Sequence, residues 1–93
     1  MNNIIKENII KEAKQLDNIG DCFGIKITSD KGLFVQVEYS FDGNKEYFIE
    51  LNDVDAENCY EPCGDYNESA DFGNIEMLIN KIENYLEYHG INL

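Results

Sequence analysis

Residues 33–51 read LFVQVEYSFDGNKEYFIEL, two β-rich runs joined by a turn, and this stretch decides the fold. Apolar and polar residues alternate in both runs, which is typical of strands that bury one face. The apolar positions are Leu33, Val35, Val37, Tyr39 and Phe41 in the first run and Tyr47, Ile49 and Leu51 in the second. The pattern therefore predicts a β-hairpin whose two apolar faces contact the same core.

The length of the turn in this hairpin sets the register of the two strands. A two-residue turn would place Val37 opposite Glu50 and would mismatch the buried faces. A loop of three or five residues would place Val37 opposite Ile49 or Leu51, respectively. We therefore expect the longer loop, with residue 43 or 44 at positive φ.

The remaining elements are predicted from periodicity and from helix-capping residues. An apolar stripe predicts a helix over 2–18, a short alternating run predicts a strand over 22–28, and a second stripe predicts a helix over 74–89. Asn2 or Asn3 can cap the first helix, Asp71 or Asn74 can cap the second, and Gly90 can end it. The sequence thus predicts one α+β domain over 1–93. It has two layers: a three-stranded antiparallel meander and an N-terminal and a C-terminal helix, in the order α-β-β-β-α.

The charge of the chain is strongly acidic and unevenly distributed. Nineteen acids and seven lysines give a net charge of −12 over 93 residues. Residues 1–45 carry seven acids and six lysines, whereas residues 46–93 carry twelve acids and Lys81 alone. This asymmetry favours a cationic partner. It argues against direct binding to nucleic acid and against an anionic membrane surface, because both would repel the chain.

The segment 52–71 (NDVDAENCYEPCGDYNESAD) is predicted to be a long acidic loop. It has seven acids, no base and no regular periodicity, and loops of this length are usually functional or disordered. No membrane span or signal peptide is expected from the hydropathy. Three cysteines, an odd number, indicate reduced thiols and a cytoplasmic location in the host cell.

Enzymatic and metal-binding chemistry have weaker support in the sequence. The one histidine, His89, lies in the last turn of a predicted helix, and there is no Gly-rich phosphate loop, so neither catalytic residues nor a cofactor are predicted. Cys59 and Cys63 could hold zinc with His89 and Cys22, but at a loose spacing. Asp65 to Glu76 matches a calcium loop in part, although Ala70 stands where that loop needs glycine.

The hairpin also carries a resemblance to a known family. Its apolar strand, its DGN turn followed by a second apolar strand, and the small acidic chain around it resemble the phage anti-CRISPR proteins that inhibit Cas9 by mimicking DNA. The likeness covers roughly 20 residues. It implies that Asp42, Asn44 and Glu46 enter a groove that would receive duplex DNA, with Gly43 shaping the turn. Lys45 departs from the family pattern by placing a positive charge in the turn.

These observations predict a non-enzymatic inhibitor that binds a basic nucleic-acid-binding protein. In its most specific form, the prediction names a CRISPR effector such as Cas9 as the partner. The chain itself would be a monomer or a small homo-oligomer. The candidate partner-binding residues are Glu38, Asp42, Asn44, Glu46, Glu50, Asp53, Asp55, Glu57, Glu61, Asp65 and Glu68. The alternatives are an immunity protein that neutralises a basic nuclease toxin, or a calcium- or zinc-binding interaction module.

Overall fold

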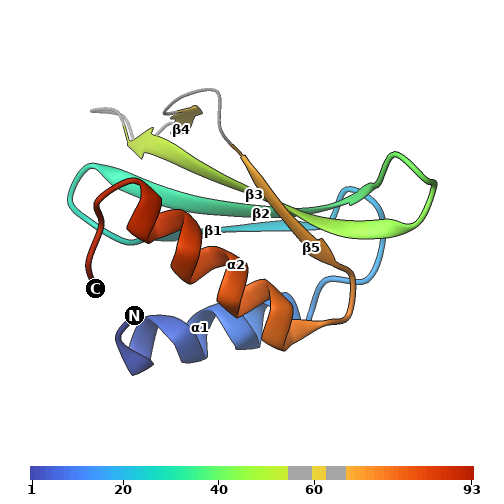
Figure 1. Cartoon of the computed structure of the whole chain (residues 1–93), viewed down its shortest axis with the longest axis horizontal. Coiled ribbons are helices and arrows are strands. Elements are labelled where there is room, and N and C mark those ends of the chain that lie inside the picture. The colour runs from blue at the N-terminus through green and yellow to red at the C-terminus, as the bar shows by residue number, and fades with distance from the viewer. Residues whose placement is uncertain (55–59, 63–66) are drawn as a thin grey trace.

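The computed structural model describes residues 1–54, 60–62 and 67–93. The elements are α1 (Asn3–Ala13), β1 (Cys22–Lys26), β2 (Lys31–Tyr39), β3 (Lys45–Val54), β4 (Tyr60–Pro62), β5 (Glu68–Asp71) and α2 (Ile75–Tyr88). Strands β1 to β4 form an antiparallel meander, and β5 pairs antiparallel with β3 as well. Figure 1 shows both helices on the same side of this sheet, so the domain is α+β with an N-terminal and a C-terminal helix.

The prediction of three strands was wrong, and so was the loop over residues 52–54, 60–62 and 68–71, which are strands. The rest of that predicted loop, 55–59 and 63–66, lies outside the described residues, apart from residue 67. Strand β3 continues to Val54, β4 pairs with residues 52–54 of β3, and β5 pairs with residues 46–49. Strand β5 has only four residues, of which Ala70 alone is buried, so it offers too few alternations to produce a strand signal. Pairing with the long strand β3 therefore decides the conformation of residues 60–62 and 68–71, rather than their composition.

The β2–β3 hairpin keeps the predicted faces but not the predicted register. Val37 lies opposite Tyr47, so its expected partners, Ile49 and Leu51, were wrong. The connection is the longer type, five residues from Ser40 to Asn44, and Gly43 has φ +89° as expected. Because the shift is an even number of residues, every apolar side chain still faces the core.

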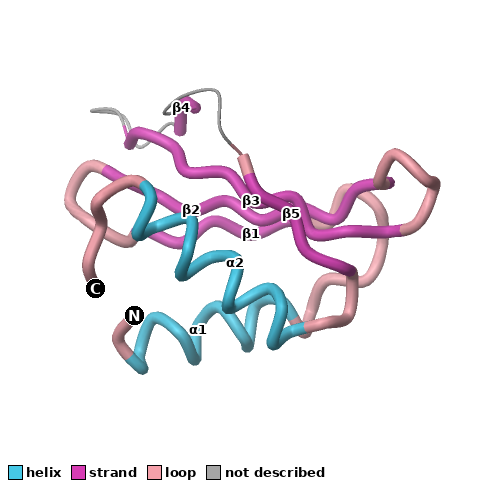
Figure 2. The backbone as a smooth tube through the Cα atoms, viewed as in Figure 1, coloured by secondary structure: helices cyan, strands magenta, loops and turns pink. Residues whose placement is uncertain are grey.

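The core lies between the inner face of the sheet and the two helices (Figures 1 and 2). Its fully buried side chains include Ile9 from α1, Leu33, Val35, Val37 and Ile49 from the sheet, and Leu78 and Ile82 from α2. Burying each such side chain stabilises the fold by about 1.5–3 kcal/mol. None of the helices in the described part of the chain is long and apolar enough to cross a membrane.

The helix ends differ in how closely they follow the sequence. Asn2 caps α1 by accepting from the Ile5 N–H (2.9 Å), and Asn74 caps α2 by accepting from the Met77 N–H (3.0 Å). Gly90, with φ +73°, ends α2 as predicted. Helix α1 ends at Ala13, five residues earlier than predicted, because the following residues turn and fold over the Asp21 carboxylate.

Tyr85 of α2 fills a gap in the hydrogen bonding along the side of β3 that pairs with β4 and β5. Strand β5 pairs with β3 up to Ile49, and the pairing of β4 with β3 begins at Asn52. Glu50 and Leu51 therefore have no strand partner on that side of β3 among the described residues. There the Leu51 N–H donates to the Tyr85 hydroxyl (3.0 Å), and both residues are buried. The helix thus completes the hydrogen bonding where β3 changes partners.

Candidate functional site

Three carboxylates lie in register across the outer face of the sheet, on the side away from the helices. Glu38 of β2 lies directly opposite Glu46 of β3, and Glu46 lies directly opposite Asp71 of β5. Residues directly opposite one another in antiparallel strands project from the same face at about 4.5–5.5 Å between Cβ atoms. Together with Asp42 in the adjoining turn, they form what we call the acidic cluster (Glu38, Asp42, Glu46 and Asp71).

Electrostatic repulsion within the acidic cluster is concentrated on Glu46. Its pKa is raised above the usual glutamate value, first by partial burial and then by the charges of Glu38, Asp42 and Asp71. Like charges directly opposite in a sheet destabilise it. The fold therefore holds Glu46 in a position where its ionised form is disfavoured.

Asp42 is held by the turn in the ionised form. Its carboxylate accepts from the Ser40 hydroxyl and from the Asn44 N–H (3.2 Å). These hydrogen bonds lower the pKa of Asp42, the Ser40 bond having the larger effect. The turn itself is closed by the Ser40 N–H to the Asn44 carbonyl (2.6 Å) and the Gly43 N–H to the Ser40 carbonyl (2.9 Å). The tip of the hairpin is thus a hydrogen-bonded structure that presents a charged carboxylate.

Lys45, the base that departs from the anti-CRISPR pattern, is directed away from the acidic cluster. It precedes Glu46 in β3, and successive strand residues project from opposite faces. Its ammonium donates to the Asp17 carbonyl (2.7 Å) and lies 4.8 Å from the centre of the Phe72 ring. Of the described strand residues on the outer face, Lys26 of β1 is the only base.

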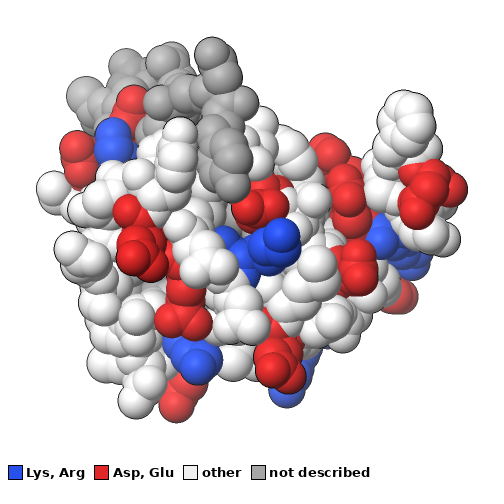
Figure 3. All heavy atoms as spheres, in the orientation of Figure 1, with Lys and Arg blue, Asp and Glu red and all other residues white. Residues whose placement is uncertain are grey.

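A hollow of about 440 Å³ lies beside the hairpin tip, next to the acidic cluster. It is lined by Ser40, Phe41, Asp42, Asn44, Lys45, Glu46 and Asp71. Phe41 is completely exposed (111%), and Tyr39 is 66% exposed. Figure 3 shows acidic side chains at this end of the molecule next to basic ones, and further acidic side chains over the rest of the visible face. The hollow therefore brings three acidic residues and Lys45 together with an exposed aromatic residue.

The other predicted acids lie outside the acidic cluster. Glu50 is on the outer face, opposite Phe34. The side-chain amide of Asn52 donates a hydrogen bond to the Glu50 carboxylate (2.8 Å). Asp53 projects from the other face and forms an ion pair with Lys31. Glu61 is in β4 opposite Asp53, and Asp55, Glu57 and Asp65 lie outside the described residues.

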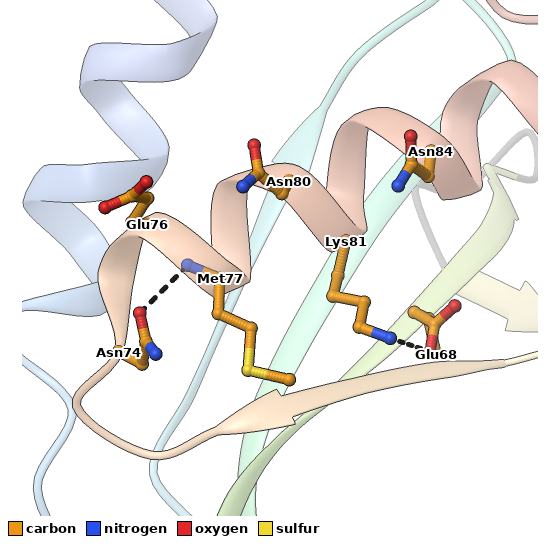
Figure 4. Close-up of a pocket in the computed structure, with 7 residues that line it drawn as sticks. All are labelled: Glu68, Asn74, Glu76, Met77, Asn80, Lys81 and Asn84. Atoms are coloured by element: carbon orange, nitrogen blue, oxygen red, sulfur yellow. Dashed lines mark hydrogen bonds and ion pairs between the residues drawn. The ribbon is translucent and has the colours of Figure 1, made fainter.

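Glu68 lies on the helix side of the sheet, in a second hollow of about 450 Å³ between β5 and α2. Figure 4 shows Lys81 of α2 reaching down to Glu68, with nitrogen and oxygen 3.6 Å apart. The rest of the lining is Asn74, Glu76, Met77, Asn80 and Asn84. The lining of this hollow thus holds two acids and one base, whereas the hollow at the hairpin holds three acids and one base.

The structure also bears on the metal-binding alternatives. The middle of the calcium-loop pattern is strand β5, in which Ser69 and Asp71 pair with Phe48 and Glu46, and a calcium loop is not built that way. Cys22 is exposed on β1, and His89 follows α2 with its ring against Tyr85 and Tyr88. Cys59 and Cys63 lie outside the described residues. Within 1–54, 60–62 and 67–93, no three potential ligands come together to hold a metal ion.

Sequence reasoning missed two residues of this site, Asp71 and Phe41, and it placed the exposed Tyr39 in the core. Asp71 belongs to the acidic cluster only because β5 pairs with β3. A four-residue strand is too short for its sequence pattern to predict that pairing. Tyr39 and Phe41 were assigned to the buried face by alternation, but both are exposed. The signal that could have found them is the polar turn immediately after Tyr39, which ends the strand before Phe41.

Comparisons of this chain with protein-family models, with curated proteins and with solved structures find no match.

Proposed function

We propose that this protein is an acidic inhibitor that occupies the nucleic-acid-binding surface of a basic protein by mimicking DNA. The observation that carries the proposal is the row Glu38, Glu46 and Asp71, which sets three carboxylates in register across three strands. In this function the carboxylates stand in for phosphates. Lysines and arginines that normally contact the nucleic-acid backbone would contact the acidic cluster instead.

The energetic cost of the row supports a role in binding. Two directly opposed pairs of like charges destabilise the sheet by about 0.2–1 kcal/mol each. Solubility does not require such an arrangement, because the net charge of −12 could be spread over the surface without opposing pairs. A cationic partner would offset the repulsion among these carboxylates. Binding would then be favoured by the relief of a repulsion that destabilises the free protein.

The rigidity of the scaffold supports the same proposal. The row is fixed by pairing of β2, β3 and β5, and Asp42 is fixed by the hydrogen bonds of its turn. Preorganised groups lose little conformational entropy when a partner binds. The inhibitor needs no catalytic residue and no cofactor, and it would act in the cytoplasm of a host cell.

The most specific form of the proposal is inhibition of a CRISPR effector such as Cas9. The resemblance of the second hairpin to anti-CRISPR proteins rests on the turn at Asp42, Gly43 and Asn44. Lys45 does not oppose this form, because its ammonium is held by the Asp17 carbonyl on the other side of the strand. A guide-loaded effector also contains the required surface, a positively charged channel for nucleic acid.

The test is a competition for DNA on guide-loaded Cas9. A fluorescent target duplex is bound, the inhibitor is titrated at increasing salt, and displacement is followed by anisotropy. The parent chain is expected to displace the duplex at low salt and to weaken as salt rises, because charge–charge attraction is screened.

Two triple variants separate the acidic cluster from net charge. Glu38→Gln, Glu46→Gln and Asp71→Asn remove the row, whereas Glu7→Gln, Glu12→Gln and Glu87→Gln remove three charges from the helices. The two variants have the same net charge as each other, three units less negative than that of the parent. The row variant is expected to lose inhibition and the helix variant to keep it. Equal inhibition by the two variants would contradict the assignment of the site, and no displacement by the parent would contradict the CRISPR form of the function.

A further inference from the structure

The hairpin end exposes two aromatic residues, of which Phe41 lies beside the acidic cluster. Tyr39 is the last residue of β2, and it continues the inward row of Val35 and Val37, yet it is 66% exposed. Phe41, two residues later, is completely exposed in the turn. Figure 1 shows that the β2–β3 turn projects past both helices.

The exposed ring of Phe41 is presented by an ordered turn. The hydrogen bonds of Ser40, Asp42 and Asn44 close the loop around it. A phenylalanine in such a place forgoes the stabilisation that burial would give. Aromatic residues, phenylalanine included, are enriched in protein interfaces relative to the rest of the surface.

The combination of ring and charge indicates which form of nucleic acid is imitated. Duplex DNA presents phosphates outside, while its base faces are stacked inside and inaccessible. A single strand presents both its phosphates and the flat faces of its bases, and proteins that bind it combine a cationic groove with stacking platforms. At the hairpin end, Phe41 lines the same hollow as Asp42, Glu46 and Asp71, and Lys45 borders that hollow too.

We propose that the β2–β3 hairpin end mimics single-stranded nucleic acid, with Phe41 in place of an unstacked base and the acidic cluster in place of phosphates. The partner surface is then a cationic groove with an aromatic or apolar stacking platform, the kind that holds a displaced strand. This inference rests on the proposed function and specifies its partner site. Phe41 supplies stacking, and the carboxylates supply charge complementarity.

The experiment uses guide-loaded Cas9 with two fluorescent probes, an oligo-dT strand and a duplex that carries only the protospacer-adjacent motif. The parent chain is expected to displace oligo-dT at a lower concentration than the duplex. Loss of one stacked ring weakens single-strand binding by about 5- to 150-fold. Phe41→Ala is therefore expected to weaken displacement of oligo-dT within that range.

Three comparisons make the result specific to stacking. Phe41→Trp keeps a flat ring and is expected to restore displacement, whereas Phe41→Leu keeps only apolar bulk and is expected to fail. Ile4→Ala removes another exposed apolar side chain (73%) from α1 and is expected to behave as the parent. Thermal melts verify that each variant is folded, which is expected because the altered side chains are exposed.

The outcomes separate this inference from the proposed function. If the parent displaces the duplex but not oligo-dT, or if Phe41→Ala inhibits as well as the parent, the single-strand inference is wrong while DNA mimicry stands. If the parent displaces neither probe, the CRISPR form of the proposed function fails, and this inference fails with it.

Discussion

Replacing Glu46 by glutamine should stabilise the fold while it weakens the inhibitor. The ionised side chain lies directly opposite both Glu38 and Asp71, and each such pair costs about 0.2–1 kcal/mol. After partial screening by solvent and salt, removal of the charge should add about 0.5–1 kcal/mol to the free energy of unfolding. For a domain of this size, 1 kcal/mol corresponds to about 4–8 °C in Tm.

The pH dependence of the effect gives a second measurement. Because the pKa of Glu46 is raised in the folded state, its contribution to stability is greatest below the ordinary value of 4.5 and is lost as pH rises through the raised value. Glutamine removes this loss. The Tm advantage of Glu46→Gln should therefore be present at pH 7, shrink as pH falls, and vanish well below pH 4.5.

Thermal melts at low and high salt, followed by circular dichroism, test this reasoning. Glu7→Gln, on the exposed face of α1, makes the same change in net charge and should alter stability by less than about 0.5 kcal/mol. The advantage of Glu46→Gln should decrease at high salt. A Tm at pH 7 that is equal to or lower than the parent's would refute the claim that the row is strained.

Three further changes test the scaffold that holds the site, each by thermal melting. Tyr85→Phe leaves the buried Leu51 N–H without its acceptor and should cost about 1–3 kcal/mol; an unchanged Tm would mean that this hydrogen bond contributes nothing. Asn74→Ala removes the acceptor for the Met77 N–H and should cost about 1 kcal/mol, and a Ser at the same position should recover most of it. Asp42→Asn should lower Tm above pH 3.8, and its Tm should approach that of the parent as pH falls below this value. The reason is that the lowered pKa of Asp42 gives stability that is present at higher pH and lost in acid. A difference in Tm that grows in acid would contradict this.

The sequence determined those parts of the fold that repeat a period over many residues. The alternation in β2 and β3 and the apolar stripe of α2 are long enough to specify which face is buried, and the structure agrees with both. The register was harder to predict, because any shift by two residues buries the same faces. What selected it was the Asp42 turn, whose hydrogen bonds to Ser40 and Asn44 begin the loop two residues earlier than expected.

The candidate site could be predicted in part, for a related reason. Glu38, Asp42 and Glu46 come from one hairpin, so local pattern and turn chemistry bring them together. Asp71 reaches them through pairing between β3 and β5, a contact between segments far apart in the sequence that no local period encodes. Counting charges was also misleading for Asp53 and Glu68, because their strand positions direct them to lysines on other elements.

Stability of the free protein and binding of a cationic partner place opposite demands on the charges around Glu46. A sheet optimised for stability would place an opposite charge across from Glu46, and Lys45 is adjacent in sequence but held on the other face by the Asp17 carbonyl. The nearest base is thus kept away from the place where it would most stabilise the free protein. A partner that supplies lysines or arginines would satisfy Glu46 only in the complex, and this difference between the free and bound states is what makes the acidic cluster a binding surface.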